Sequence, residues 1–121
     1  LKKFNIYNRN FGTKEELMED IAVSRLCLIP GHKAELFCIA AEEARELCVP
    51  IVSMGIGSLS ERIINGKTGY IASNEKQFAE YTIELLNNDE LWNSMRNNML
   101  EMRGSMEWSN ISKKFISKLI I

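Results

Sequence analysis

Two glutamates, Glu35 and Glu43, have the side-chain type and spacing needed to bind a ligand rich in hydroxyl groups. They lie eight residues apart on or beside an expected helix, a span of about 12 Å at 1.5 Å per residue. That span is close to the reach from the sugar to the ribose of a nucleotide sugar. Carboxylates accept hydrogen bonds from vicinal hydroxyls, and one charge-assisted bond contributes about 1.5–3 kcal/mol. The pair therefore predicts a site for such a ligand.

The helix expected over residues 36–47 would position Glu43. Its apolar face consists of Leu36, Ala40, Ala44 and Leu47, and the residues predicted to lie opposite, in solvent, are Glu42, Arg45 and Glu46. Glu43 projects onto the flank of the apolar face, where a carboxylate is costly unless a donor meets it. Two interpretations stay open. In the first, water or a nearby cation satisfies that carboxylate, and in the second a bound ligand does.

The elements around this helix are typical of a layered α/β domain, in which short apolar runs alternate with helical patterns. Strands are expected at residues 4–7, 26–29, 49–54 and 70–72, and the run 26–29 is predicted to be buried on both faces. Thr13, followed by acidic residues, predicts the N-cap of a helix that ends near Ser24. In a parallel sheet, ligands bind at the carboxyl ends of the strands, where helix N-termini present N–H groups to anions.

Residues 74–121 show only helical patterns, so residues 1–121 are expected to form a single domain with an α/β part (1–73) and a helical part (74–121). Asp89 is predicted to cap one of these helices, and Ser109 or Asn110 the last one. Because so small a sheet leaves open edges, and because the sequence begins at Leu1 rather than Met, we expect a piece of a longer chain.

Composition limits the remaining classes of function. The net charge of −1 provides no basic field for nucleic acid, and no apolar run approaches the length of a membrane span. Cys27, Cys38 and Cys48 are expected to be buried thiols in a reducing compartment. A single histidine is too few for a Cys/His zinc site, and no metal site or cofactor is predicted. The N-terminus lacks a signal-peptide pattern, so the cytoplasm is the expected location.

Four sequence blocks share one register: ELFCIAAEEA at 35–44, VPIV at 49–52, GSLSE at 57–61 and NGKTGY at 65–70. In order and spacing they resemble the C-terminal, nucleotide-sugar-binding lobe of the retaining glycosyltransferases of the GT-B fold, family 4. That family has a Glu-x7-Glu motif, a G-x-P-V-V strand, a G-G-x-x-E loop and a D-G-x-T-G-x turn. The resemblance covers nearly the whole chain, and four blocks in register are far more specific than any single one.

The resemblance implies a Rossmann-like parallel sheet layered with helices, with an all-helical C-terminal third, and a role for each matching residue. Glu35 would be the catalytic residue near the transferred sugar, and Glu43 would hold the ribose hydroxyls. Substrate would also contact the backbone around Phe37, Cys38 and Ile39 and, at the diphosphate, Gly57, Ser58 and Leu59. Glu61, Gly66 and Gly69 would be structural. A plain turn at Gly57 and a carboxylate favoured by the helix dipole at Glu61 stay open as alternatives.

The sequence also departs from the family pattern. Leu36 and Cys38 replace both glycines of the Glu-x7-Glu motif, and Cys48 replaces the glycine before the second strand. Side chains are therefore expected to intrude where the family backbone approaches closely. The basic pair that neutralises the donor diphosphate lies upstream of the matching segment in the family and is missing here. His32 and Lys33 are in the right loop to supply some positive charge, although a solvated loop lysine is the simpler interpretation of Lys33.

The function implied is transfer of a sugar, with retention, from a nucleotide diphosphate sugar to a hydroxyl of a glycan or a lipid-linked acceptor, in polysaccharide or glycoconjugate biosynthesis. An N-terminal acceptor-binding domain would complete the enzyme. The enzyme would work in the cytoplasm, with a peripheral position at the inner face of the membrane as one option. We expect the 121-residue chain to bind nucleotide weakly and not to turn over. A catalytically silent relative used for assembly, and an unrelated nucleotide-binding or flavodoxin-like domain, are the alternatives.

Overall fold

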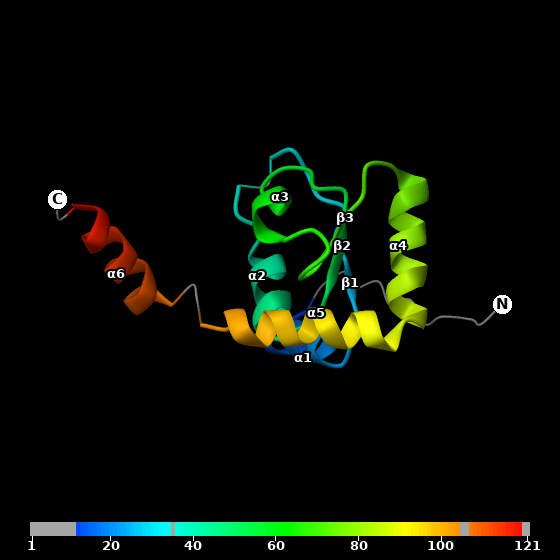
Figure 1. The fold of residues 1–121 in the computed structure, drawn as a ribbon, viewed down its shortest axis with the longest axis horizontal. Helices are drawn as coiled ribbons and strands as arrows, with labels where there is room; N and C mark the ends of the chain where they lie inside the picture. Colours follow the sequence, from blue (N-terminus) through cyan, green and yellow to red (C-terminus); the bar gives the residue numbers. More distant parts are fainter. Residues whose placement is uncertain (1–11, 35, 105–106, 120–121) are drawn as a thin grey trace.

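The computed structural model describes residues 12–34, 36–104 and 107–119. These residues form three strands and six helices, and an α/β part precedes a helical part (Figure 1). The elements are α1 (Lys14–Ala22), β1 (Cys27–Leu28), α2 (Ile39–Glu46), β2 (Ile51–Ser53), α3 (Leu59–Arg62), β3 (Gly69–Ile71), α4 (Glu75–Asn87), α5 (Asp89–Met102) and α6 (Trp108–Leu119). The α/β class and the helical C-terminal third are therefore confirmed.

The sheet is parallel, with the strand order β1-β2-β3. All three residues of the central strand β2 are buried, as expected for a parallel strand covered on both faces. At Gly69 in β3, a Cβ would lie 2.1 Å from the carbonyl oxygen of Ile51, so glycine is required for this pairing. The strand predicted at 49–54 forms over the shorter range 51–53, and the strand predicted at 70–72 forms one residue earlier, at 69–71. The strand predicted at 4–7 lies outside the described residues.

The first strand differs from its prediction. Residues 26–29 were expected to be buried on both faces, whereas Cys27 is only partly buried and Leu28 is 39% exposed. Within the described residues β1 is an edge strand, so fewer elements surround it than surround β2. Cys27 is still buried enough to raise the pKa of its thiol to about 11.

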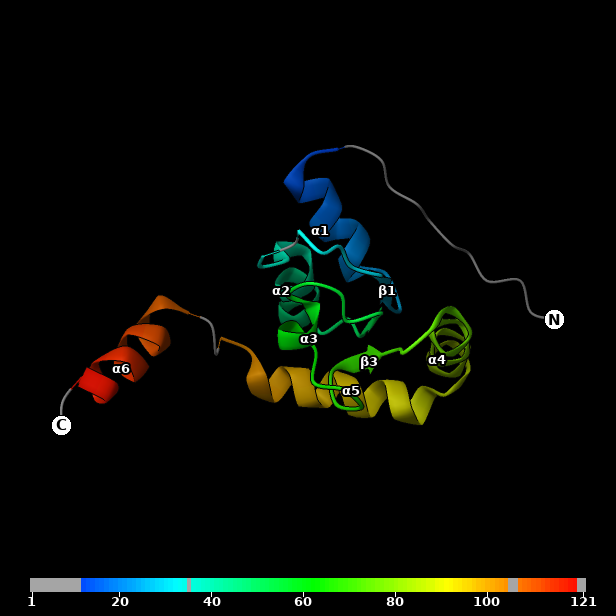
Figure 2. The same ribbon diagram turned by 90° about the horizontal axis from the view of Figure 1, so that it is seen from above.

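Helices cover both faces of the sheet (Figure 2). Ile51 packs with α1, α2 and α3, and the next residue, Val52, packs with α4 and α5 on the opposite face, as strand geometry requires. The first cluster consists of Ile21, Cys38, Ala41, Ala44, Val49, Ile51, Leu59 and Ile63, and the second of Cys48, Val52, Leu85, Met95 and Met99. Met95 and Met99 of α5 therefore belong to the core.

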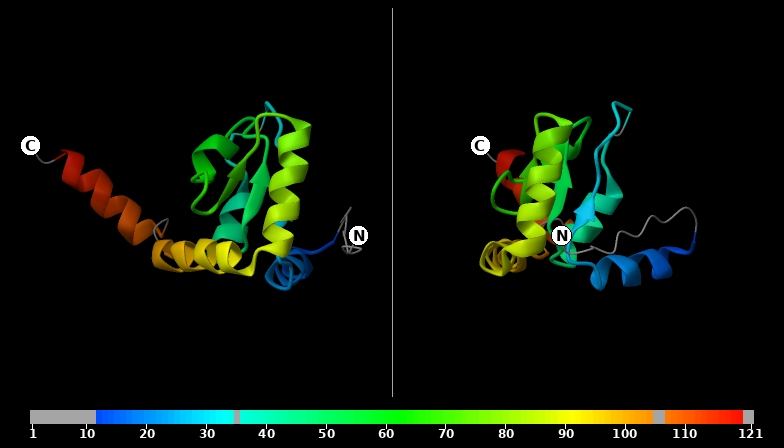
Figure 3. Two further views of the ribbon diagram at one scale, coloured as in Figure 1. Left: turned by 45° about the vertical axis from the view of Figure 1, so that its right-hand side comes forward. Right: turned by 90° about the vertical axis from the view of Figure 1, so that its right-hand side faces the viewer.

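Helix α5 crosses the amino ends of the strands (Figure 3). Trp92 Nε1 donates to the carbonyl of Arg25, just before β1, at 2.7 Å. A hollow of about 280 Å³ opens beside Trp92 at this edge. The opposite, carboxyl edge is left to loops, and α6 lies apart from the sheet (Figure 1). No helix among the described residues is both long enough and apolar enough to cross a bilayer.

The helix starts follow local capping chemistry. Thr13 and Glu16 form a capping box at α1, which confirms the predicted N-cap. The prediction for α5 was wrong by one residue: Asn88, whose backbone is extended, is the N-cap, and its side chain accepts from the amide of Leu91 at 3.0 Å. Helix α6 begins at Trp108, before the two residues predicted to cap it.

Candidate functional site

The carboxyl edge of the sheet consists of the loops that follow β1 and β2. The amide of Met54 and the hydroxyl of Ser53 both donate to the carbonyl of Pro30, at 3.1 and 3.3 Å. A parallel bridge between Gly31 and Ile56 extends this pairing beyond the strands. A Cβ on Gly31 would lie 2.7 Å from the carbonyl oxygen of Ile56, so glycine permits the approach. The two loops therefore lie side by side where ligands of parallel α/β folds bind.

Helix α2 rises from this edge, but it starts at Ile39 and not at residue 36. The reason is Cys38, whose φ of 56° and ψ of 76° lie in the left-handed region and interrupt the helical path. Leu36 therefore does not join the apolar face of α2, to which it was assigned, and is 89% exposed. The first amides of a helix lack intrahelical acceptors, and α2 begins at the edge where an anionic ligand is expected.

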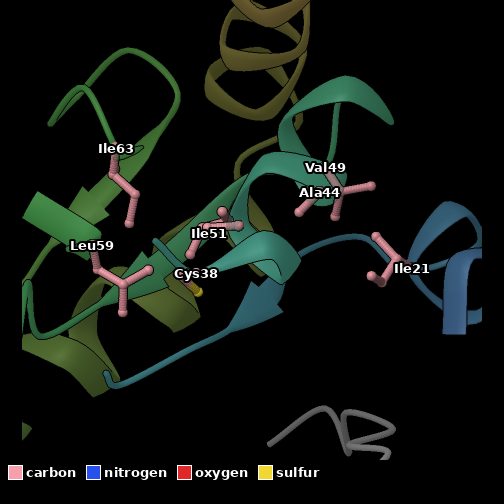
Figure 4. Packing of buried hydrophobic residues seen from close by; sticks show 8 residues of the cluster. Ile21, Cys38, Ala44, Val49, Ile51, Leu59 and Ile63 are labelled. Atoms are coloured by element: carbon pink, nitrogen blue, oxygen red, sulfur yellow. The ribbon is translucent and has the colours of Figure 1, made fainter. Parts of the chain in front are cut away.

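Among the described residues, Cys38 and Cys48 are the non-glycine residues with positive φ. Both stand where the resemblance expects glycine. The expectation that side chains intrude there was wrong for Cys38, which is 5% exposed and packs in the cluster that includes Ile51 (Figure 4). The chain thus keeps a glycine-like backbone and turns the side chain into the core, at a cost of about 1–2 kcal/mol.

Glu43 lies four residues after the start of α2, on the side that contacts α1. Its carboxylate is 14% exposed, and Oε1 lies 3.5 Å from Nζ of Lys14. A nearby cation, one of the partners for Glu43 that the sequence analysis left open, is therefore present. The Lys14 side chain is 72% exposed, and such a pair is worth about 0–1 kcal/mol. A ligand that offered hydroxyl donors to Glu43 would displace Lys14 at little cost.

The charged face of α2 is buried, which corrects the prediction for Glu42 and Arg45. Arg45 is 8% exposed, and its Nη2 lies 2.6 Å from Oε2 of Glu42. Nη1 of Arg62 lies 3.4 Å from the other oxygen of Glu42. The helical projection placed these residues in solvent, but α2 packs against both α3 and α5. Glu46, with 37% of its side chain exposed, is half-buried.

The loop between β2 and α3 contains the residues predicted to line a diphosphate. Gly57 has a φ of 68°, which fits the turn interpretation as well as the binding one. Ser58 is 6% exposed, and its buried hydroxyl has no hydrogen-bond partner among the described residues. Leu59 is fully buried and packs in the cluster that includes Ile51. Glu61 is exposed on α3.

The turn before β3 is closed by its own hydrogen bonds. Gly66 donates its amide to the carbonyl of Gly69 at 2.9 Å, and the side chain of Asn65 accepts from the amide of Ile71 at 3.0 Å. Thr68 is buried and accepts from the amide of Ile64 at 2.9 Å. The turn fixes β3 against β2 and lies outside the loops that form the candidate site.

Glu35, the predicted catalytic residue, lies outside the described residues. In the loop before it, His32 and Lys33 are exposed, and Nδ1 of His32 accepts from the amide of Ala34 at 3.1 Å. Within the ranges that the structure describes, no group of three or more metal-ligating side chains gathers.

Sequence reasoning missed two residues that contact this site, Lys14 and Arg62. Lys14 lies in the first turn of α1, and Arg62 is the last residue of α3. Each reaches α2 from another helix, so no spacing rule within α2 predicts the contact. The only local signal was the carboxylate-rich segment of α2, which required cations from elsewhere in the fold.

Comparison with known proteins supports the motif argument. The family model described as glycosyl transferases group 1 matches residues 6–102. The chain belongs to this family. It is also 29% identical over 83 residues to an uncharacterized glycosyltransferase of Methanocaldococcus jannaschii, an alignment that covers 67% of this chain and 24% of the relative. The chain thus spans about a quarter of that relative's length. No solved structure matches the chain.

Membership in this family confirms the resemblance that the four sequence blocks predicted. The protein is a glycosyltransferase family 4 domain, and its three-stranded parallel sheet with flanking helices is consistent with the C-terminal lobe of the GT-B fold.

Proposed function

We propose that this chain is the donor-binding part of a glycosyltransferase that transfers a sugar, with retention, from a nucleotide diphosphate sugar to a hydroxyl of a glycan or lipid-linked acceptor. The observation that supports the proposal most is the family match over residues 6–102, which includes every loop of the carboxyl edge. A second lobe binds the acceptor in this proposal, and the cleft between the lobes excludes water from the reaction.

Each part of the donor has a proposed partner. Glu43 accepts hydrogen bonds from the ribose diol, and Glu35 lies near the transferred sugar. The backbone amides of residues 37–39, at the positive end of α2, face the sugar or the phosphates. Gly57, Ser58 and Leu59 line the diphosphate, where a phosphate oxygen would accept from the Ser58 hydroxyl.

Two features of the site support these roles. The Ser58 hydroxyl is buried and lacks a partner among the described residues, and such groups usually signal a missing partner. Glu43 is 14% exposed. Among the described residues, the cation within ion-pair distance of it is Lys14, whose long side chain is mostly exposed. Both groups would gain hydrogen bonds from a sugar or phosphate that reached them.

The chemistry requires stabilisation of a leaving diphosphate and of an oxocarbenium-like sugar. The dipole of α2 contributes positive potential at the diphosphate, and His32 and Lys33 lie in the adjoining loop. Catalysis by the whole enzyme then depends on the second lobe for the acceptor hydroxyl and for closure of the cleft.

Titration of the chain with nucleoside diphosphates tests the proposal. UDP, GDP and ADP are added separately, and NMR chemical shifts are followed because these report millimolar affinities. For the diphosphate that binds, Glu43→Ala should raise the Kd about 10- to 150-fold, the range of one charge-assisted hydrogen bond of about 1.5–3 kcal/mol. Glu101→Ala, at an exposed position of α5, is the control and should leave the Kd unchanged.

A catalytically silent domain used for assembly is the second candidate. The specific observation in its favour is the Lys14–Glu43 ion pair, which satisfies the carboxylate without a ligand. Under this alternative none of the diphosphates shifts the resonances of residues 36–44 or 57–59. Equal affinities of the wild-type chain and the Glu43→Ala variant would likewise refute the proposed role of Glu43.

A further inference from the structure

Arg62, the last residue of α3, connects the two loops of the candidate site. Its Nε donates to the carbonyl oxygen of Phe37 at 3.1 Å, and its guanidinium carbon lies 4.0 Å from the centre of the Phe37 ring. Phe37 belongs to the segment that leads into α2, whereas α3 follows directly on the loop of Gly57 and Ser58. One side chain thus joins the segments proposed to meet the donor.

The guanidinium is itself held by buried charges. Its Nη1 lies 3.4 Å from Oε1 of Glu42, and Oε2 of Glu42 lies 2.6 Å from Nη2 of Arg45. The side chains of all three residues are 15% exposed or less. Charges in such surroundings are expensive to separate, because removal of one partner leaves another unpaired. The Arg62 side chain is therefore restricted to one position over Phe37.

The contact with the Phe37 carbonyl has a consequence for the next amide. The peptide bond is planar and trans, so the Phe37 carbonyl and the Cys38 N–H point in opposite directions within one plane. When Arg62 fixes the carbonyl toward α3, it also fixes the direction of the Cys38 N–H. The left-handed backbone of Cys38 then sets where Ile39 and the first turn of α2 begin.

We propose that Arg62 is a positioning residue for the donor site. It holds the peptide between Phe37 and Cys38 in the orientation that presents the amides at the start of α2 to the diphosphate or sugar. This inference rests on the proposed function, since the amides matter for donor binding only if the donor binds at this edge. Arg62 acts through the backbone, and its own charge is paired with Glu42, a carboxylate that it shares with Arg45.

The test compares Arg62→Met and Arg62→Lys with a matched control, Arg103→Met. Arg103 makes the equivalent contact at the other end of α2, where its Nε donates to the carbonyl of Glu46 at 3.0 Å. Two quantities are measured on the full chain: hydrogen exchange of the amides of residues 37–40, and the Kd for UDP, GDP or ADP, whichever binds the wild-type chain.

Arg62→Met should accelerate exchange at residues 37–40 at least about tenfold and raise the Kd at least about tenfold, as expected for loss of a hydrogen bond from a charged donor. Arg62→Lys should restore part of both, because an ammonium group also donates to a carbonyl. Arg103→Met should change neither quantity more than about twofold, even where its loss of thermal stability is similar.

The proposal is overturned if Arg62→Met leaves exchange at residues 37–40 unchanged, or if it and Arg103→Met raise the Kd equally. If the wild-type chain binds none of the three diphosphates, the proposed function fails, and the exchange measurement still decides whether Arg62 orders this segment. If Arg62→Met does not fold, the comparison of Arg62→Lys with the wild-type chain provides the same two readouts.

Discussion

The left-handed backbone of Cys38 leads to a prediction about where glycine is tolerated. At an ordinary buried helix position, replacement of alanine by glycine is destabilising. At Cys38, with a φ of 56°, glycine should cost almost nothing relative to alanine. At residue 38, the comparison is between Cys38→Ala and Cys38→Gly. At residue 41, it is between the wild-type chain, which has alanine there, and Ala41→Gly. Ala41 lies in α2 and is 1% exposed, so the two sites are equally buried.

The magnitudes follow from three terms. Loss of the buried methyl group costs about 0.8 kcal/mol at both sites. Glycine also costs about 0.5–1 kcal/mol at both sites through the entropy of the unfolded chain. Only at residue 38 does removal of Cβ relieve the left-handed strain of about 1–2 kcal/mol. The expected cost of alanine-to-glycine replacement is therefore about 1.3–1.8 kcal/mol at residue 41 and near zero at residue 38.

Urea denaturation followed by circular dichroism measures the four free energies of unfolding, and equal m-values are required for the comparison. Because both variants at residue 38 lack the thiol, any interaction of the sulfur cancels. If glycine destabilises residue 38 as much as residue 41, the left-handed backbone contributes no strain, and the explanation for the late start of α2 fails.

Two further predictions concern stability. Burial raises the pKa of Cys27 from 9.0 to about 11, so between pH 9 and 11 the unfolded chain loses a proton that the folded chain keeps. The free energy of unfolding of the wild-type chain should then fall with pH by up to about 1.4 kcal/mol per pH unit relative to that of Cys27→Ala. Urea titrations of both proteins between pH 9 and 11 measure this difference, and parallel pH profiles would exclude the effect. Asn88→Ala removes the N-cap of α5 and should cost about 1 kcal/mol in the same assay, whereas an unchanged midpoint would show that the cap is dispensable.

The class of fold could be predicted from the sequence because its signals are local. The apolar run in the central strand needs no partner to be recognised, and the same is true of the Thr13 capping box and of the turn at residues 65–69. The bounds were less accurate where one backbone angle decides them. Nothing in the residues around Cys38 indicates that a cysteine there adopts a positive φ and delays α2, although the resemblance placed glycine at that position.

The charged face of α2 could not be predicted correctly, for a different physical reason. A helical projection separates apolar from polar residues, and it places Glu42 and Arg45 together on the polar side. Such a projection does not take account of other helices, and α3 and α5 both pack against α2. Arg62 comes from α3, twenty residues away in sequence, and its contacts with Glu42 and Phe37 exist only in the folded chain. The same holds for the contact between Lys14 and Glu43.

The two replaced glycines of the Glu-x7-Glu motif are weak support for a silent domain. Cys38 keeps the left-handed backbone and directs its side chain into the core, so it does not fill the edge where the ligand is proposed to bind. Charge is the stronger criterion, because a leaving diphosphate must be neutralised. Arg62 is already paired with Glu42, which leaves His32 and Lys33 as the exposed basic residues described in the adjoining loop. Under the proposed function, the choice between an active and a silent enzyme therefore depends on which cations neutralise the diphosphate at this edge.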